Sequence, residues 1–555
     1  MHTEERAAGN FLARHFLLCS LVLLLITRLV AWFNTAIISR DSVIYIELAR
    51  YWVAGHYFKA LAHPYHPLYP FLIAVAEKVS GFSFEHSAVG LSIIASALTL
   101  PALAIIYHRI ENRLVLILGM LFFCVSPYLI RYSADVLTEP LYLLFVAWAA
   151  AFCVKAMVLR KRRALYYFFA GLFTGLAYLT RPEGLVVGIA GVLCLLIFYK
   201  SVRLEGILYG VLLMTVGVLL VGSPYILYLH RNTGQWLLTR KKRVSTLIYD
   251  VSGKKKFQKP SVPKKLMLPK GVDKKRAEFL LNRRKWQWEQ ADRIRQILGE
   301  PKEPKVPPGS PVWRWFLVFL GSLGSVLVGF FNGMFIPIGM WVIFRFFCFK
   351  RYPWNKVDTF ILVFSALYWM MLGVLLSGYG YVSRRHYSPV AMFWFVWAAV
   401  GFIYACELIA SIFNNRHVTP KIVGAILIIP VLGISVIKGT KPYRMGKYGR
   451  KVVGMWISER KSKNTGCTIL TSMSRVGYYA GCRTISLPVI GEKDVDALRR
   501  HEIVYVVLTR REMEKVPVLM SLLGKYGYRE VYHYTSSTRH EDIWIFAFEG
   551  QRAHG

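Results

Sequence analysis

Acidic residues are scarce in this chain. It has 31 Asp and Glu against 70 Lys and Arg among its 555 residues, so the formal net charge is +39. On a soluble protein such a charge would favour nucleic acid as the partner. Here long apolar runs separate the basic residues into short clusters, and this separation excludes a continuous nucleic-acid-binding face.

Several motifs of soluble enzymes are also missing. No Cys-x-x-Cys or Cys/His spacing typical of a zinc site occurs, and no Gly-x-Gly-x-x-Gly motif follows the first predicted strand of the C-terminal region. No small-residue cleavage site follows the first apolar run. We therefore interpret that run as a retained membrane span and not as a removed signal peptide.

The sequence is instead rich in long apolar runs. Hydrophobic residues make up 55% of the chain and the mean hydropathy is +0.40. These features predict a polytopic α-helical membrane protein with about eleven spans. The spans are expected at residues 14–34, 86–108, 113–130, 136–157, 164–180, 184–200, 205–229, 326–348, 357–376, 387–411 and 420–438.

The charges of the loops predict the orientation of these spans. If the N-terminus lies in the cytoplasm, every predicted inner loop carries basic residues, as the positive-inside rule requires. An odd number of spans then places the C-terminus outside. We therefore predict a protein of the cytoplasmic (inner) membrane, whose loops with Asp41, Glu139 and Arg385 form an active site on the outer face.

We expect two domains. Residues 1–445 are predicted to form a transmembrane catalytic domain, and residues 446–555 a small extracytoplasmic α/β domain with short strands near Cys467, Arg483 and Ile503. Within the first domain, residues 236–312 form a Lys-rich insertion. It could be a solvated loop or a cationic platform for a phosphate-rich lipid or an acidic polysaccharide.

The C-terminal domain has two cysteines, Cys467 and Cys482. Cys467 begins one predicted strand and Cys482 directly precedes the next, and parallel neighbours at that level come close enough to form a disulfide. An extracytoplasmic location would permit the oxidation. The alternative is two separate buried thiols.

A carboxylate stands directly after the first apolar run, in Ser39-Arg40-Asp41-Ser42. An amphipathic stretch follows, and then the aromatic turn His63-Pro64-Tyr65-His66-Pro67-Leu68-Tyr69-Pro70. This order resembles the first outer loop of the GT-C glycosyltransferases, in particular the branch with the protein O-mannosyltransferases and the lipid A aminoarabinose transferase. The resemblance implies a GT-C fold and an enzyme that takes a sugar from a polyprenyl phosphate lipid.

Three further segments carry the resemblance. Thr138-Glu139-Pro140-Leu141 and Thr180-Arg181-Pro182-Glu183-Gly184 are similar to segments of the family, and Arg385-His386-Tyr387-Ser388-Pro389 loosely matches its Arg-Tyr-x-x-Pro pattern. The chain departs from the family where many relatives have two adjacent acids, because Ser42 follows Asp41. It also has histidines in the aromatic turn, where a second acid is common.

The resemblance makes Asp41 the expected catalytic base. Asp41 would take the proton of the acceptor hydroxyl as the lipid phosphate leaves, in one displacement with inversion. The alternative is an N-cap role for a helix that starts at Ser42, because Asp favours that position.

Arginines are the expected ligands of the donor phosphate. Arg384, Arg385 and Arg131 lie on the predicted outer face, and guanidinium groups bind phosphate with a planar fork and stay charged. For Arg384 and Arg385 the alternative is anchoring of the chain at the membrane interface.

The other expected substrate contacts come from the same loops. They are His63, His66, Tyr69, Asp135, Glu139 and Tyr387. Glu139 could hydrogen-bond a sugar hydroxyl or pair with an arginine and tie two loops together. His63 and His66 could orient a hydroxyl, bind a divalent metal with a carboxylate, or pack in a Pro-rich turn. That metal is the only cofactor that the residues suggest.

The expected partners are a polyprenyl-phosphate-linked sugar, an acceptor hydroxyl on a lipid, protein or glycan, and membrane lipids. Two alternatives stay open. An oligosaccharyltransferase would use a lipid diphosphate, but its usual Trp-Trp-Asp signature is absent from the C-terminal region. A transporter would show polar interruptions near the midplane of two corresponding halves, whereas here the polar residues gather at the ends of the spans.

Overall fold

The structure is a computed structural model. It describes residues 2–108, 113–159, 162–198, 204–240, 335–379, 382–413, 417–461, 466–486, 502–515, 517–536 and 541–548, and a few single residues between 320 and 331 and at 498 and 500. The described residues form two compact units. The first unit contains the described residues up to Thr35 and those from Ile44 to Pro442. The second unit contains Ala36–Val43 and the described residues from Tyr443 onward.

The first unit is helical in its described part. Its helices are α1 (His2–Phe33), α2 (Arg40–Val53, shared with the second unit), α3 (Tyr57–Leu61), α4 (Leu68–Ser80), α5 (Phe84–Tyr107), α6 (Arg113–Val125), α7 (Pro127–Ser133), α8 (Glu139–Val158), α9 (Arg163–Thr180), η2 (Pro182–Gly184), α10 (Leu185–Ile197), α11 (Leu204–Thr233), α15 (Ile336–Phe347), α16 (Lys356–Tyr379), η4 (Arg384–Tyr387), α17 (Ser388–Phe413) and α18 (Pro420–Thr440).

Each of the eleven predicted spans overlaps an apolar helix. Among the described residues, seven helices are long and apolar enough to cross a membrane, or eight if α6 and α7 form one span bent by 54°. Pro127 stands at the start of α7 and cannot donate an amide into the preceding turn, which explains the break. The full count of spans and their orientation stay predictions.

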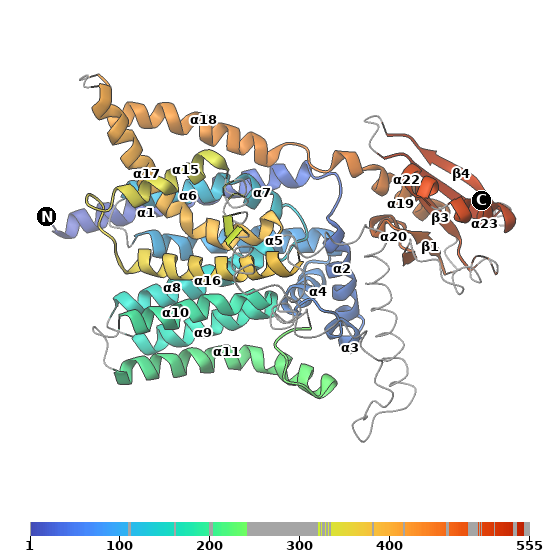
Figure 1. The fold of residues 1–555 in the computed structure, drawn as a ribbon, viewed down its shortest axis with the longest axis horizontal. Helices are drawn as coiled ribbons and strands as arrows, with labels where there is room; N and C mark the ends of the chain where they lie inside the picture. Colours follow the sequence, from blue (N-terminus) through green and yellow to red (C-terminus); the bar gives the residue numbers. More distant parts are fainter. Residues whose placement is uncertain are drawn as a thin grey trace. The chain divides into compact units, whose positions relative to one another are not determined.

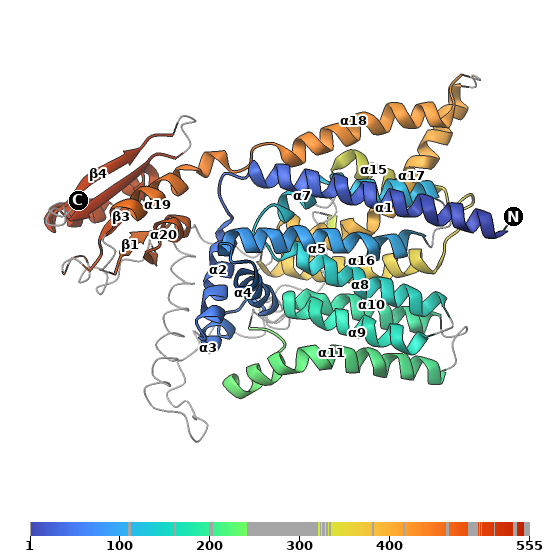
Figure 2. The same cartoon turned by 180° about the vertical axis from the view of Figure 1, so that it is seen from behind.

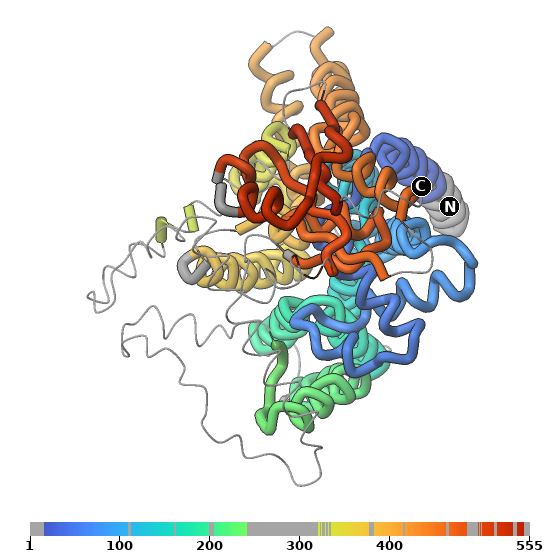
Figure 3. Tube along the Cα trace, turned by 90° about the vertical axis from the view of Figure 1, so that its right-hand side faces the viewer, coloured from blue at the N-terminus to red at the C-terminus, as the bar shows by residue number. Residues whose placement is uncertain are grey.

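The long helices of this unit run side by side, while α2, α3 and α4 lie across one end of the bundle (Figures 1 and 2). Seen along the bundle, α9 and α11 are neighbours (Figure 3). Their close approach depends on glycine, because a Cβ on Gly171 of α9 would collide with the backbone of Met214 in α11. Likewise, a Cβ on Gly217 would collide with the backbone of Phe168.

The second unit contains a sheet with strand order β2-β1-β3-β5-β4. The strands are β1 (Thr468–Thr471), β2 (Arg483–Ser486), β3 (Tyr505–Thr509), β4 (Tyr528–Tyr534) and β5 (Ile543–Phe548), and the helices are α19 (Gly449–Arg460), α20 (Ser474–Ala480), α22 (Arg510–Lys515) and α23 (Pro517–Lys525). β1 pairs in parallel with β2 and β3, and β5 is antiparallel to β3 and β4.

Alternation of side chains along the strands gives the sheet two apolar faces. Ile469 of β1 and Val507 of β3 pack in a cluster with α19 and α20. Leu470 and Val506 pack in a second cluster that includes Leu519 of α23. Helices thus cover both faces, and the expected small α/β domain is confirmed. The apolar pattern of the sequence predicted β1, β2 and β3 but not the antiparallel pair β4 and β5.

Cys467 and Cys482 form a disulfide, with Cα atoms 4.9 Å apart. Thr468 of β1 is in register with Arg483 of β2, and the amide of Arg483 donates to the carbonyl of Cys467 at 2.8 Å. Of the two alternatives left open for these cysteines, the disulfide is therefore the one that the structure shows. The Lys-rich insertion lies outside the described residues from residue 241 onward, so neither of its two interpretations is tested.

Candidate functional site

A buried ion network lies where α8 begins. Glu139 is the first residue of α8, where the helix dipole favours an acid. Its Oε1 lies 2.6 Å from Nη1 of Arg181, which occupies the break between α9 and η2. Arg181 also lies 3.5 Å from Glu183 through its Nε. Three segments are therefore joined by charge at one point of the helical unit.

Arg385 completes this network. Its Nε lies 3.6 Å from Oε1 of Glu139, and the short helix η4 before α17 carries it. The Glu139 side chain is 1% exposed, whereas the Arg385 side chain is 29% exposed. Arg385 therefore combines a buried partner with access from outside the fold, which a phosphate-binding arginine requires. Arg181 and Glu183 brace the hairpin between α9 and α10.

Tyr69 and Asp135 are buried beside Glu139. The Tyr69 hydroxyl lies 3.2 Å from the Ser92 hydroxyl. Burial raises the pKa of the Tyr69 phenol well above its usual value, and the nearby carboxylates of Asp135 and Glu139 act in the same direction. Tyr69 therefore stays protonated and can serve only as a neutral hydroxyl. One oxygen of Asp135 accepts the amide of Val136 at 2.9 Å.

The other two expected phosphate ligands point elsewhere. Arg131 donates from Nη2 to the carbonyl of Lys438 at 2.5 Å, in the last turn of α18, where helix carbonyls lack partners within the helix. Arg384 is exposed and donates from Nη1 to the Tyr128 hydroxyl at 2.6 Å. Among the three arginines, Arg385 is the one that the structure joins to Glu139.

The two histidines of the aromatic turn have different contacts. His66 is buried, with its ring 5.1 Å from the Tyr178 ring and 5.3 Å from the Tyr225 ring. His63 accepts the amide of Tyr65 at 3.2 Å. No group of three or more His, Cys, Asp or Glu side chains that could hold a metal occurs in the described part of the chain. Tyr387 is buried at the end of η4.

Asp41 lies in the first turn of α2, which begins at Arg40 and not at Ser42. Ser39 makes the capping contacts instead, because its hydroxyl accepts the amide of Ser42 at 3.2 Å and lies 2.6 Å from the Ser42 hydroxyl. The alternative of an N-cap role for Asp41 is therefore wrong. Asp41 is half-buried, at a helix end that favours a negative charge.

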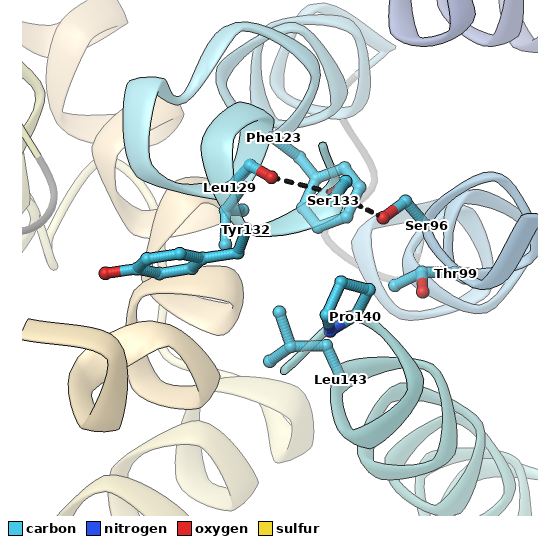
Figure 4. Close-up of a pocket in the computed structure, with 8 residues that line it drawn as sticks. All are labelled: Ser96, Thr99, Phe123, Leu129, Tyr132, Ser133, Pro140 and Leu143. Atoms are coloured by element: carbon cyan, nitrogen blue, oxygen red, sulfur yellow. Dashed lines mark hydrogen bonds between the residues drawn. The ribbon is translucent and has the colours of Figure 1, made fainter. Parts of the chain in front are cut away.

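A small pocket lies between α5, the α6–α7 bend and the start of α8 (Figure 4). Hydroxyls of Ser96, Thr99 and Ser133 line it, and the Ser96 and Ser133 hydroxyls are 2.7 Å apart. The Ser133 hydroxyl also donates to the carbonyl of Leu129 at 2.7 Å. These hydroxyls have partners within the fold, and the other side chains around them are mostly apolar.

Arg28 is a buried charge that was missed in the sequence. Arg28 of α1 is fully buried and donates to the carbonyls of Cys124 and, at 3.2 Å, Phe123 at the end of α6. It thereby satisfies carbonyls freed by the bend before α7. The available signal was a charged residue inside an apolar run, which is costly without partners.

Comparison with known proteins identifies the fold. Residues 62–228 match the family model described as dolichyl-phosphate-mannose-protein mannosyltransferase. The apo structure of ArnT from Cupriavidus metallidurans superimposes with a TM-score of 0.54 at 10% identity, over 97% of this chain and 98% of that one. This chain has the GT-C fold. The predicted resemblance is confirmed, whereas a search of curated proteins finds no match.

Two other solved structures agree with this GT-C assignment. ArnT from Cupriavidus metallidurans bound to undecaprenyl phosphate has a TM-score of 0.52 at 11% identity, with 96% of this chain and 97% of that chain covered. The Archaeoglobus fulgidus oligosaccharyltransferase in complex with Zn and sulfate has a TM-score of 0.54 at 12% identity, with 96% and 73% covered. At these identities the likeness establishes the fold alone.

Proposed function

We propose that this GT-C protein is a glycosyltransferase that moves a sugar from a polyprenyl-phosphate-linked donor to an acceptor hydroxyl. The match of a lipid-phosphate-dependent family to residues 62–228 supports the donor class. The similarity to ArnT, which was solved with undecaprenyl phosphate, supports it as well. The acceptor hydroxyl would belong to a lipid, a protein or a glycan, and the reaction would take place at the outer face of the cytoplasmic membrane.

The proposed step is one displacement. Asp41 accepts the proton of the acceptor hydroxyl, and the acceptor oxygen forms a bond to the anomeric carbon of the sugar. The bond between that carbon and the phosphate oxygen breaks, and the phosphate leaves with the electron pair. The anomeric configuration is inverted, and the products are the glycosylated acceptor and the polyprenyl phosphate.

Arg385 is the proposed ligand of the leaving phosphate, and its environment carries this part of the proposal. The guanidinium is tied to the buried Glu139 but remains partly exposed. Such an arrangement fixes a cation in place before the donor binds, and preorganised charge stabilises the charge that develops on a leaving group. Glu139 holds Arg385 and Arg181, so its proposed role toward the sugar is secondary to positioning the arginine.

No step in this proposal passes through a metal. His63 and His66 do not gather with a third ligand among the described residues. The Archaeoglobus fulgidus oligosaccharyltransferase was solved in complex with Zn and sulfate, and a divalent metal on this chain stays a prediction.

The donor class can be tested directly. Purified protein in detergent would be incubated with polyprenyl-monophosphate mannose or aminoarabinose, and separately with a polyprenyl-diphosphate-linked sugar. We expect release of free polyprenyl phosphate from a monophosphate donor only. Transfer from the diphosphate donor alone would favour an oligosaccharyltransferase, and no release from any donor would favour a transporter.

A further inference from the structure

The loop that precedes α2 is held by residues from the far end of the chain. This loop and the first turn of α2, together Ala36–Val43, belong to the second unit. Arg444 donates from Nη1 to the carbonyl of Ile37 at 3.2 Å, and Arg475 donates from Nη1 to the carbonyl of Ile38 at 3.3 Å. Two arginines of the second unit therefore bind successive carbonyls of the loop.

Arg475 is the more deeply placed of the two. It stands in the first turn of α20 and is 5% exposed. A buried guanidinium requires acceptors for its N–H groups, and the loop carbonyl supplies one. Lys447 and Arg450 lie in the same region of the unit. Burial and the nearby charges of Arg475 and Arg450 lower the pKa of Lys447. A neutral carbonyl with its negative end toward Arg475 is a favourable partner there.

Local hydrogen bonds connect Ile38, the residue that Arg475 binds, with the turn that carries Asp41. Ile38, which accepts from Arg475, is itself buried. The next residue, Ser39, binds Ser42 through its amide at 3.1 Å and through its hydroxyl at 2.6 Å. Asp41 lies between these two serines in the first turn of α2. The segment that carries Asp41 is thus held by Arg475 at Ile38 and by the hydrogen bonds between Ser39 and Ser42, which flank Asp41 in the sequence.

We propose that Arg475 is a positioning residue for Asp41. Its hydrogen bond to Ile38 fixes the loop that carries the base, so the C-terminal domain contributes to catalysis without contacting the substrate. This inference rests on the proposed function, because the role assigned to Asp41 comes from there. The geometric part, that Arg475 holds the loop, stands on the contacts within the second unit alone.

The geometric part can be measured without any substrate. Hydrogen exchange would be followed in the full-length protein in detergent, on peptides that cover residues 36–43 and on β1. In Arg475→Ala we expect the loop to exchange about tenfold faster, because loss of a charged hydrogen bond promotes local opening. Exchange at wild-type rates in this loop would contradict the inference.

Arg450→Ala is the matched control. Arg450 lies in the same unit, and its guanidinium pairs with Glu541, with 2.8 Å between Nε and Oε2. This variant should leave loop exchange unchanged. If Arg475→Ala does not fold, Arg475→Lys takes its place. In that variant we expect hydrogen exchange faster than in wild type in the loop and equal to wild type in β1. Equal exchange in Arg475→Lys and wild type at both places would then overturn the inference.

Turnover separates a positioning role from a structural one. Release of polyprenyl phosphate from polyprenyl-phosphate mannose would be compared in wild type, Arg475→Ala, Asp41→Asn and the double variant. Arg475→Ala should lower kcat by about 10- to 100-fold with little change in KM, because small misplacements of a catalytic group are costly. In the Asp41→Asn background the same substitution should cause no further loss.

The two proposals fail in different ways. If Asp41→Asn is inactive and Arg475→Ala turns over like wild type, the positioning role is wrong and the proposed function stands. Losses that multiply in the double variant would also contradict it, because Arg475 would then act independently of Asp41. If Asp41→Asn turns over like wild type, the role of Asp41 as the base fails, and the positioning role of Arg475 fails with it, whatever the exchange experiment shows.

Discussion

Glu139 forms an ion pair with Arg385, with 3.6 Å between Oε1 and Nε, and the same oxygen lies 2.6 Å from Arg181. One buried carboxylate thus restrains two arginines from separate helical segments. A buried charge that loses its partner is strongly unfavourable. The pairing therefore serves the stability of the helical unit and also fixes the direction of Arg385.

Substitution of Glu139 should destabilise the fold. Glu139→Gln removes the nearer of the two charged partners of the buried Arg181 guanidinium, and we expect a loss of about 3–5 kcal/mol. Reversible denaturant unfolding in mixed micelles would measure it. The control is Glu407→Gln, because Glu407 pairs with the exposed Arg351, and such surface pairs contribute about 0–1 kcal/mol. Equal losses in the two variants would contradict the assignment.

Arg385 and Arg384 should differ in donor binding. Arg385→Ala removes the cation that Glu139 holds, and we expect undecaprenyl phosphate to bind more weakly by about 2–5 kcal/mol. Arg384→Ala should have a smaller effect, because Arg384 is exposed and bound to Tyr128. Binding would be measured by competition with a labelled lipid. The reverse order, or a complex whose phosphate lies more than about 8 Å from both guanidinium groups, would refute the assignment.

The disulfide should stabilise the C-terminal domain. It closes a loop with a sequence separation of 15, and a loop of this size is worth about 3 kcal/mol in the chain-entropy model. Replacing Cys467 and Cys482 with Ser should therefore speed hydrogen exchange in β1 and β3 of the full-length protein. Cys19→Ser is the control, because Cys19 is a free thiol in α1. Unchanged exchange in the double variant would contradict this expectation.

The predicted orientation can be tested with single cysteines. Lys525 at the end of α23 is exposed, and Arg351 lies in a predicted inner loop. An impermeant thiol reagent should label Lys525→Cys from the outside only and Arg351→Cys from the inside only. Labelling of Lys525→Cys from the cytoplasmic side alone would overturn the orientation, and with it the outer active site.

Local patterns explain what the sequence could predict. Apolar runs located the helices because hydropathy alone decides which segments can enter a membrane. The predicted strands after Cys467 and Cys482 made a disulfide possible, but only the register of β1 and β2 decides it over two separate thiols. β4 was missed, because its burial alternates irregularly and much of it is exposed.

Contacts between distant segments could not be predicted in the same way. The sequence suggested a sugar hydroxyl or an arginine as the partner of Glu139, but no local pattern specifies Arg385. The contact of Arg475 with Ile38 is more remote still, and nothing around Arg475 marks it in the sequence. Such pairings are consequences of the assembled fold, since they depend on how whole helices and strands pack.

The central claim is that Asp41 is the base of a lipid-phosphate-dependent sugar transfer. The most direct measurement is release of polyprenyl phosphate by purified wild type, Asp41→Asn and Glu47→Gln. Glu47 is the control, because it lies in the same helix and accepts the Tyr51 hydroxyl at 2.9 Å. We predict that Asp41→Asn still folds and binds the lipid but loses about two to four orders of magnitude in turnover, with Glu47→Gln unaffected. Wild-type turnover in Asp41→Asn would contradict the account.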